Sequence, residues 1–402
     1  MRNLVLSAIL WSFLAGVAVG QCSHVGDASV SWPNNYGAGS ASLDADIYYP
    51  AICSGLNAPV MPSAGGHPVV VFLHGWGKLG SDYYRIGRAL ASMGIVAVMM
   101  NTARHSYALM EEDAKALFGA MNTATSTEGA FFQGTMNMSK VGLMGHSMGG
   151  AVLALVLNES PSAPSKNPGY KCALGIAPVD PSLAVANTVV TVPIGLVSAM
   201  GDTLTPPYLH AIPYYNSLVP VAGLKFHYKM DSVATHMNLV GLGQVNPAIF
   251  DRSLQIVSGF FGQFLNGKAS GLETVLGVDG LSEPHLVSVD RQMVVPQTWS
   301  DGDLRVGSQT RISIAAEAGF AGLIVASSAA LPTQTSVGSL LLDPSSAVPL
   351  VETLIVGNRL DVMIAVPALS QLVGASFAIQ GGGATINEPF KLGSAISFTI
   401  GS

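Results

Sequence analysis

The pentapeptide at residues 145–149, Gly-His-Ser-Met-Gly, places a serine between two glycines in the pattern G-x-S-x-G. The apolar run 141–144 before it predicts a strand, and residues 150–157 after it predict a helix. A serine on such a turn takes a strained backbone, and flanking glycines let the strand and the helix approach closely. Its hydroxyl would lie above the sheet edge at a helix N-terminus, where developing negative charge is stabilised. Ser147 is therefore the candidate nucleophile.

A second segment that could take part in catalysis is the loop 74–77, His-Gly-Trp-Gly, which follows the apolar run 69–73. Acyl transfer needs two backbone N–H groups aimed at the oxyanion, one from the residue after the nucleophile and one from such a loop. Met148 is the candidate for the first donor, and Trp76 is the candidate for the second. The alternative is that the two glycines of the loop only turn the chain.

Two further loops carry a carboxylate and an imidazole, in the chain order expected after a G-x-S-x-G serine. Asp202 follows the strand-like run 193–197, and His236 follows the run 224–230. We expect His236 to accept the proton of the nucleophile and Asp202 to orient the imidazole. Asp180 also follows a strand-like run and is the alternative acid.

Three other histidines are given structural interpretations. His227 lies inside a strand-like run, where we expect a packed or surface side chain. His146 flanks the candidate nucleophile and is expected to shape the turn rather than to take a proton. We expect His74 to belong to the architecture of its loop.

Strand-like and helix-like segments alternate between residues 44 and 265. Several of the strand-like runs are apolar at nearly every position, which is typical of strands covered on both faces. This alternation predicts a mostly parallel sheet flanked by helices, and hence an α/β fold. The runs that define it are 69–73, 95–100, 141–144, 174–177, 193–197 and 224–230.

The N-terminus combines one positive charge, Arg2, with an apolar run over residues 4–19. That run is too short and too lightly flanked for a membrane span, and it is typical of a signal peptide cleaved near Gly20. We therefore expect secretion. The alternative is a lipoprotein anchored at Cys22, although Gln21 stands where a lipidation signal has a small residue.

From about residue 283, apolar and polar residues alternate between turn signals such as Asp301-Gly302. Such period-two strands predict an antiparallel β-sandwich of about 120 residues. The residues before it are rich in glycine and other small residues and predict a joint. We therefore expect a signal peptide at 1–20, an α/β catalytic domain at 21–267, a linker at 268–282 and a C-terminal β-sandwich accessory domain at 283–402.

The composition excludes two classes of protein. With a formal net charge of −6, the chain lacks the excess of basic residues that is typical of a nucleic-acid binder, so we expect no nucleic-acid partner. Hydrophobic residues make up 49% of the 402 residues and charged residues only 10%, which excludes disorder for most of the chain.

Three cysteines, Cys22, Cys53 and Cys172, allow at most one disulfide. The pair Cys22–Cys53 is favoured, because Cys172 opens an apolar run and is expected to be a buried small residue. No spacing of cysteine and histidine resembles a zinc site. We therefore expect neither a metal nor a cofactor.

Together these motifs resemble a bacterial α/β-hydrolase. The most similar branches are the dienelactone hydrolase-related esterases and the cutinase-like polyester hydrolases that attack poly(ethylene terephthalate). The resemblance extends over residues 40–267. It rests on residues 48–51, 69–77, 101–103, 145–150, 201–202 and 236.

The resemblance implies a role for each candidate. Ser147 is the nucleophile, His236 is the base, and Asp202 orients the base. Trp76 and Met148 donate to the oxyanion, and Trp76 also stands where the polyesterases place an aromatic ring in contact with the acyl group.

The chain departs from the polyesterases near the substrate. They carry a tryptophan after the strand that follows the nucleophile helix, whereas Val179 stands here and is expected to line the substrate site. The nucleophile is also serine rather than the cysteine of true dienelactone hydrolases, so that reaction is not implied. No long insertion would form a lid, which favours an open cleft, and the tyrosines 208, 214 and 215 either line it or pack a helix onto the sheet.

We therefore expect a secreted serine hydrolase of carboxylic esters, an esterase or cutinase-like polyesterase that acts through an acyl-enzyme. Its substrate would be a small-molecule or polymer ester. The alternatives are a secreted binding or adhesion protein with a vestigial hydrolase domain, or a thioesterase or peptidase with the same triad. The accessory domain either attaches the enzyme to a surface or polymer or covers the catalytic domain, and the sequence indicates no oligomeric state.

Overall fold

The computed structural model describes residues 24–161, 163, 166–181, 188–220, 223–316, 319–355, 359–384 and 390–402. The expected signal peptide at 1–20 lies outside these residues, as does Cys22, on which the favoured disulfide with Cys53 and the alternative lipid anchor both depend. Cys172 is buried, as the run around it predicts, and Cys53 is exposed. Within the described residues, no helix is both long enough and apolar enough to cross a bilayer.

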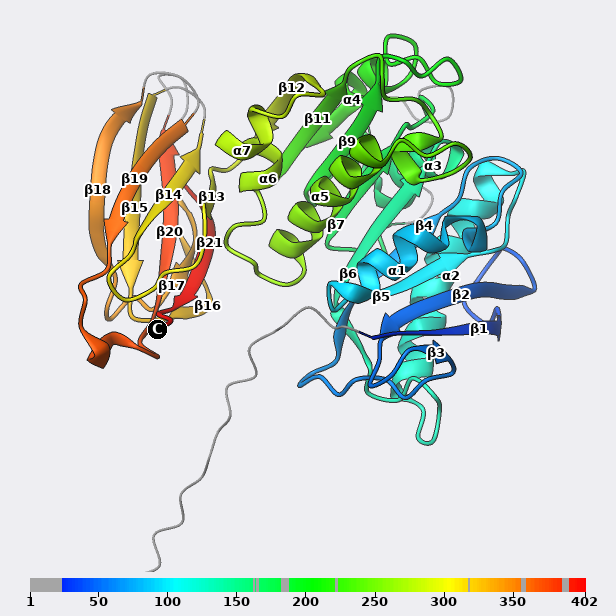
Figure 1. Cartoon of the computed structure of the whole chain (residues 1–402), viewed down its shortest axis with the longest axis horizontal. Coiled ribbons are helices and arrows are strands. Elements are labelled where there is room, and N and C mark those ends of the chain that lie inside the picture. The colour runs from blue at the N-terminus through cyan, green and yellow to red at the C-terminus, as the bar shows by residue number, and fades with distance from the viewer. Residues whose placement is uncertain are drawn as a thin grey trace, which may run out of the picture.

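A ten-stranded sheet organises the first part of the chain (Figure 1). Its strands are β1 (Val25–Pro33), β2 (Ser42–Pro50), β3 (Gly55–Leu56), β4 (His67–Leu73), β5 (Val96–Met100), β6 (Met136–His146), β7 (Cys172–Ile176), β9 (Ile194–Ala199), β11 (Leu224–Met230) and β12 (Leu286–Met293). Their order in the sheet is β12-β11-β9-β7-β6-β4-β5-β2-β1-β3. From β11 to β5 all neighbours are parallel, whereas β12 and β2 join this central block in antiparallel fashion. The predicted mostly parallel sheet is therefore confirmed.

Helices cover both faces of this sheet (Figure 1). On one face, α2 (Tyr107–Ser126), α3 (Met148–Leu157) and α4 (Ala211–Ser217) pack with alternate strand residues such as Val71. On the other face, α1 (Tyr84–Ser92) and α5 (Pro247–Phe264) pack with the intervening residues such as Val70. Every residue of β4 is buried, because a strand between two helical layers has no exposed face. A short parallel pair, β8 (Thr188–Val190) and β10 (Leu218–Pro220), lies apart from the large sheet.

The C-terminal part is built of antiparallel strands around a core of its own that includes Ile314, Leu323 and Ile379. One sheet contains β13 (Gln297–Ser300), β14 (Gln309–Ala315) and β19 (Arg359–Ala365). A second contains β18 (Val348–Ile355), β15 (Gly319–Ala326), β20 (Ser376–Ala384) and β21 (Lys391–Thr399), and β16 (Ala329–Thr335) pairs with β17 (Gly338–Leu342). The predicted change from α/β to antiparallel β structure is confirmed.

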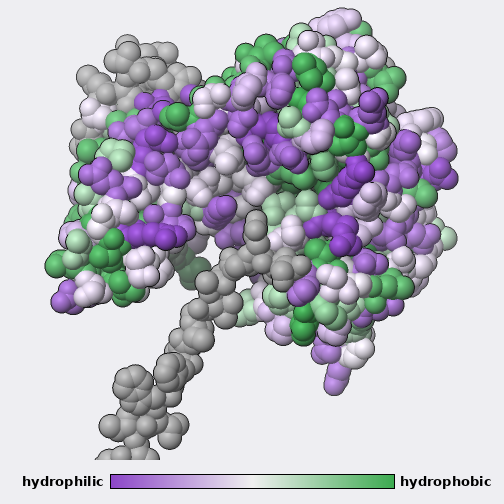
Figure 2. Space-filling model, in the orientation of Figure 1, coloured by the Kyte–Doolittle hydropathy of each residue, from purple (hydrophilic) through white to green (hydrophobic). Residues whose placement is uncertain are grey.

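Two segments near the junction lie elsewhere than the sequence suggests. β12, expected at the start of the accessory domain, pairs with β11 and extends the large sheet. The expected linker 268–282 contains α6 (Glu273–Leu276) and α7 (Val278–Leu281), and Leu272, Val275 and Leu276 are buried in the core beside α5. The surface over α7 and β12 is largely hydrophilic on the face seen in Figure 2. The junction is therefore packed rather than loose, because Leu272, Val275 and Leu276 are buried, although Val278 and Leu281 of α7 are exposed.

A buried carboxylate joins the two parts of the chain. Glu273 is only 2% exposed, and its Oε2 accepts a hydrogen bond of 2.7 Å from the indole N–H of the buried Trp299. Its Oε1 accepts from the guanidinium of Arg311 at 2.7 Å and from the N–H of Val278 at 2.9 Å. Each carboxylate oxygen thus has a partner, as a buried charge requires. Glu273 fixes the C-terminal sheets to α6 through directional contacts.

Candidate active site

Ser147 occupies the turn between β6 and α3. Its φ of 54° lies in the left-handed region, which residues other than glycine rarely adopt. A Cβ on Gly145 would lie 2.3 Å from the carbonyl oxygen of Gly149, and one on Gly149 would lie 2.2 Å from that of Leu73. Both flanking positions therefore require glycine. The N–H of Ser147 donates to the oxygen of Ile176 at 3.0 Å, which ties the turn to β7.

The loops after β9 and β11 bring a carboxylate and an imidazole together at the same edge of the sheet. Oδ2 of Asp202 lies 2.7 Å from Nδ1 of His236, although the two residues are 34 positions apart. Both side chains are buried. Because β6, β9 and β11 all run in the same direction, their carboxyl ends lie on the edge that carries Ser147. This pair can hold the imidazole with Nδ1 protonated and Nε2 available for a proton.

The hydrogen bonds to Asp202 favour its ionised form. Oδ1 accepts from the N–H groups of Leu204 at 2.9 Å and Thr205 at 2.8 Å, and Oδ2 accepts from the Thr205 hydroxyl at 2.7 Å. Burial acts to raise the pKa of Asp202, but the hydrogen bond and charge of His236 and the bonds from Thr205 outweigh it. The pKa of Asp202 therefore lies below its usual value, and the carboxylate stays charged beside the imidazole.

Thr205 is a functional candidate that sequence reasoning missed. Its Oγ1 lies 2.7 Å from Oδ2 of Asp202 and 3.0 Å from Nδ1 of His236, so one hydroxyl contacts both members of the pair. The local signal was available, because an aspartate followed three residues later by threonine is typical of a turn in which the side chain caps the backbone.

Trp76 projects from the loop after β4 and is 56% exposed. Its ring centroid lies 5.3 Å from that of His105 and 6.4 Å from that of Tyr107, at the start of α2. The next residue, Gly77, has a φ of 69° and donates its N–H to the oxygen of Arg104 at 2.9 Å. Glycine is thus needed for the turn, and the turn leaves the indole facing solvent.

Met148 and Val179 both lie beside Ser147. Met148 is the first residue of α3, where a backbone N–H has no partner within the helix. The N–H of Val179 donates to the carbonyl oxygen of Ser147 at 3.1 Å. The structure therefore places next to the serine the backbone of Val179 and, at Met148, an N–H without an intrahelical partner.

Two of the other sequence candidates have structural roles. His74 is buried, and its two ring nitrogens lie 2.9 Å from the carbonyl oxygen of Gly75 and 2.8 Å from that of Thr102. Asp180 donates its backbone N–H to Nδ1 of His210 at 3.2 Å, and the carboxylate at His236 is that of Asp202. The geometry thus favours Asp202 over the alternative acid.

A buried contact between a serine and a histidine lies between β9 and β11. Nε2 of His227 is 2.7 Å from Oγ of Ser198, and both side chains are fully buried. Nδ1 of His227 has no hydrogen-bond partner within the described part of the chain. The pair therefore lacks both an orienting carboxylate and access for a substrate, and His227 is packed in the core.

His227 makes folding stability depend on pH. Burial lowers its pKa to about 4, and the nearby charge of Lys229 acts in the same direction. Above pH 6.5 the imidazole is neutral in both states, but between pH 6.5 and 4 the unfolded chain binds a proton that the folded chain does not. The free energy of unfolding should therefore decrease as the pH is lowered from 6.5 to 4, and this residue alone should account for a loss of about 3 kcal/mol at pH 4. Urea unfolding of the wild type and of His227→Phe with Ser198→Ala checks this, because the double variant should show a shallower pH slope; equal slopes would contradict it.

Several exposed apolar side chains lie on the loops at this edge of the sheet. They lie on the loop of Asp202, on the loop of His236 and on the loop after β4. Tyr208 is among them, as expected of a residue that lines an open cleft. Tyr214 is buried, as expected of a residue that packs a helix onto the sheet. The exposed residues are Trp76, Met200, Leu204, Tyr208, Leu209 and Val233.

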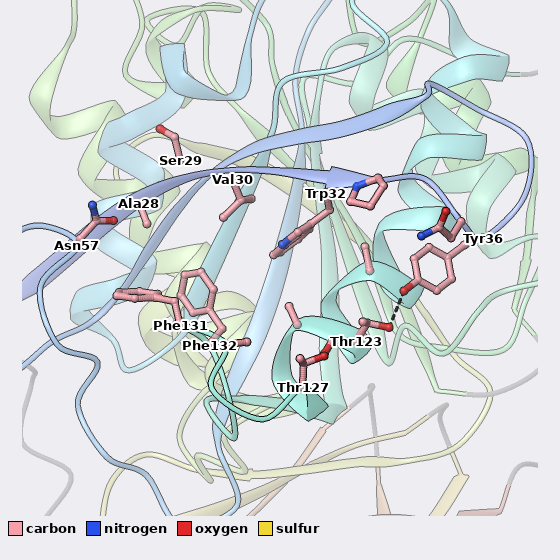
Figure 3. Close-up of a pocket in the computed structure, with 15 residues that line it drawn as sticks. Ala28, Ser29, Val30, Trp32, Tyr36, Asn57, Thr123, Thr127, Phe131 and Phe132 are labelled. Carbon is pink, nitrogen blue, oxygen red and sulfur yellow. Dashed lines mark hydrogen bonds between the residues drawn. The ribbon is translucent and has the colours of Figure 1, made fainter.

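A cavity of about 690 Å³ lies between β1 and the C-terminal half of α2 (Figure 3). The described residues that line it include Trp32, Phe131 and Phe132 and carry no charged side chain. Because α2 has 20 residues and rises about 30 Å, this cavity lies far from Tyr107 and Trp76 at its other end. It holds no nucleophile with a base beside it. In the described residues, no group of three or more His, Cys, Asp or Glu side chains could hold a metal ion.

The chain is similar to known proteins over the part that contains this site. A family model described as PETase: PET hydrolase-like matches residues 15–238, which is 224 of 402 residues. Cutinase 1 of Thermobifida cellulosilytica is 31% identical over 38% of this chain and 53% of its own length. Cutinase of Thermobifida fusca (strain YX) is 31% identical over 38% of this chain and 46% of its own length.

A bis(hydroxyethyl) terephthalate hydrolase of Streptomyces coelicolor is 29% identical over 40% of this chain and 48% of its own length. The chain thus spans about half the length of the curated relatives it matches. The family match includes Ser147, Asp202 and His236, and it ends before β12 and the C-terminal sheets begin.

Proposed function

The chain belongs to the PET hydrolase-like family of the α/β-hydrolase superfamily, and we propose that it hydrolyses carboxylic esters through an acyl-enzyme on Ser147. The observation that carries this proposal is the contact of 2.7 Å between Asp202 and His236 at the sheet edge that also bears the strained turn of Ser147. A serine on such a turn needs an oriented base beside it in order to be nucleophilic.

In the proposed mechanism, Oγ of Ser147 attacks the ester carbonyl while Nε2 of His236 accepts the hydroxyl proton. Asp202 keeps the proton on Nδ1 and stabilises the imidazolium that forms. The N–H groups of Trp76 and Met148 bind the oxyanion, whose charge the N-terminus of α3 also stabilises. His236 then gives its proton to the departing alcohol, and water repeats the sequence on the acyl-enzyme.

The substrate of the proposed reaction is an uncharged small-molecule or polymer ester. The exposed apolar side chains on the loops at this edge of the sheet, among them Leu204 and Tyr208, support a substrate with apolar groups on both sides of the ester. Relatives are named for cutin and for bis(hydroxyethyl) terephthalate, which places polymer esters and their fragments among the compounds to test. Val179 in place of an aromatic residue favours aliphatic over aromatic acyl groups.

We further propose that the chain is secreted through residues 1–20, on the evidence of its N-terminal sequence. We also propose that the accessory domain begins after β12, because β12 belongs to the large sheet. Glu273 fixes this domain in place, so any surface or polymer that it binds would be held at a set position relative to the site.

A fluorophosphonate probe tests the proposed function directly. We expect one equivalent to react with the full chain, and peptide mass spectrometry to find the label on Ser147, because only an activated serine reacts rapidly. A panel of p-nitrophenyl esters from acetate to laurate, with bis(hydroxyethyl) terephthalate and a polyester film, then defines the substrate. Heat-denatured protein is the control for nonspecific labelling. A folded chain that stays unlabelled would overturn the proposal in favour of a binding protein.

A further inference from the structure

His146, which precedes Ser147, takes no part in the proposed mechanism but lies at the centre of a buried network. Its Nε2 is 3.2 Å from the carbonyl oxygen of His236, and its Nδ1 is 2.9 Å from the hydroxyl oxygen of Tyr83. That hydroxyl oxygen also accepts the N–H of Gly75 at 3.0 Å. His146 and Tyr83 are both buried, and the ring centroids of His146 and His236 are 4.5 Å apart.

The direction of each hydrogen bond follows from the chemistry of its partners. A carbonyl oxygen can only accept, so Nε2 of His146 carries the proton and donates to His236. Burial holds the pKa of His146 well below its usual value, so the ring is neutral and its Nδ1 is an acceptor. The Tyr83 hydroxyl therefore donates to Nδ1, and its oxygen remains free to accept from Gly75. All three bonds point the same way, from the loop of Gly75 to the loop of His236, an arrangement in which each bond strengthens the next.

This network connects the three segments that the proposed mechanism must hold together. Gly75 precedes the proposed oxyanion donor Trp76, His146 precedes the nucleophile, and the accepting carbonyl belongs to the base itself. The packing is equally close, since a Cβ on Gly75 would lie 3.0 Å from the Tyr83 hydroxyl and 3.2 Å from Nδ1 of His146. Side chains locked at this density transmit a shift of one segment to the others.

We propose that Tyr83 and His146 are positioning residues that set the distance between the oxyanion donor, the nucleophile and the base. This inference rests on the proposed function. The hydroxyl of Tyr83 and the ring of His146 have no proton-transfer or bonding role in the proposed reaction, although the ring of His146 packs on that of His236. They act through the backbone of Gly75 and of His236, and they make the reaction geometry independent of loop motion.

Tyr83→Phe is the first test, because it removes one oxygen and keeps the buried ring. We expect kcat for p-nitrophenyl butyrate to fall about tenfold while KM stays within about twofold, since misplacement of the catalytic groups affects the transition state more than substrate binding. Tyr170→Phe is the matched control. The Tyr170 hydroxyl is equally buried and donates to the oxygen of Ala114 at 2.6 Å, away from the site.

The two variants separate positioning from stability. Tyr83→Phe loses two buried hydrogen bonds and Tyr170→Phe loses one, so both melting temperatures should fall, but only Tyr83→Phe should lose turnover. If kcat of Tyr83→Phe matches that of Tyr170→Phe, the network has a structural role alone and the inference is wrong.

A second pair of variants addresses the histidine. His146→Leu removes both hydrogen bonds, whereas His146→Gln keeps an amide N–H that can reach the carbonyl of His236. We expect His146→Leu to lose more kcat than Tyr83→Phe, and His146→Gln to recover part of that loss. Equal kcat in the leucine and glutamine variants would contradict the proposed contact. Ser147→Ala separates this result from the proposed function: if that variant is inactive while Tyr83→Phe is fully active, only the present inference fails.

Discussion

Replacing Ser147 with alanine is expected to lower kcat for p-nitrophenyl butyrate on the order of 10⁶-fold, to the level left by binding and oxyanion stabilisation alone. The reason is that the proposed acyl-enzyme forms on the Ser147 hydroxyl, which alanine lacks. The variant should still fold, because alanine and serine share the same cost at a φ of 54°. Steady-state hydrolysis by the purified variant, with its melting temperature as the check on folding, measures both effects.

Ser198→Ala is the matched control for this prediction. It removes a serine hydroxyl that lies 2.7 Å from Nε2 of His227, but this pair is buried in the core and, among the described residues, no carboxylate bonds Nδ1 of His227. We expect Ser198→Ala to keep the wild-type kcat and to lose some stability. If Ser147→Ala retains full activity, or if Ser198→Ala is folded but inactive, Ser147 is not the nucleophile.

The central sheet and the turn at Ser147 could be predicted because their signals are local. A strand buried on both faces is apolar at nearly every position, as β4 is, and the glycines at 145 and 149 are imposed by contacts within a few ångströms of the same turn. The order of acid and base along the chain is also a local property of two strand ends. Their contact in space is what the structure adds.

The junction could not be predicted from composition. β12 has the same alternation as the C-terminal strands, and nothing in its own residues tells which sheet it joins, because strand pairing is a long-range choice. Leu272, Val275 and Leu276 have helical spacing, but the glycines and other small residues around them led to the expectation of a linker. Because these three side chains are buried in the core, the segment packs against the sheet and helices instead of forming a loose linker.

The supporting residues of the site differ in how far sequence can reveal them. Thr205 lies three residues from Asp202, so a local turn pattern could have identified it. Tyr83 and His146 are 63 residues apart, and neither belongs to a motif that mentions the other. Their contact depends on how α1 and its preceding turn pack over β2 and β5, which only the fold determines.

Asp202→Asn is expected to reduce kcat on the order of 10⁴-fold, as loss of the acid does in serine proteases. The amide can no longer favour the tautomer in which Nδ1 of His236 is protonated, so Nε2 is not free to accept the serine proton. It also leaves an uncharged group among donors that favour a carboxylate, namely the N–H groups of Leu204 and Thr205 and the Thr205 hydroxyl. Hydrolysis of p-nitrophenyl butyrate by the purified variant measures the loss.

Asp180→Asn is the control, since Asp180 is the alternative acid suggested by the sequence. Its backbone is anchored to His210, and the carboxylate found at His236 is that of Asp202, so the variant should keep kcat within about threefold of wild type. A loss of 10⁴-fold in Asp180→Asn with an active Asp202→Asn would mean that the reacting enzyme uses the acid after β7 rather than the acid after β9.

Thr205→Val adds a graded case, because it removes the hydroxyl shared by Asp202 and His236 but keeps the carboxylate. Its loss of kcat should therefore lie between those of the two aspartate variants.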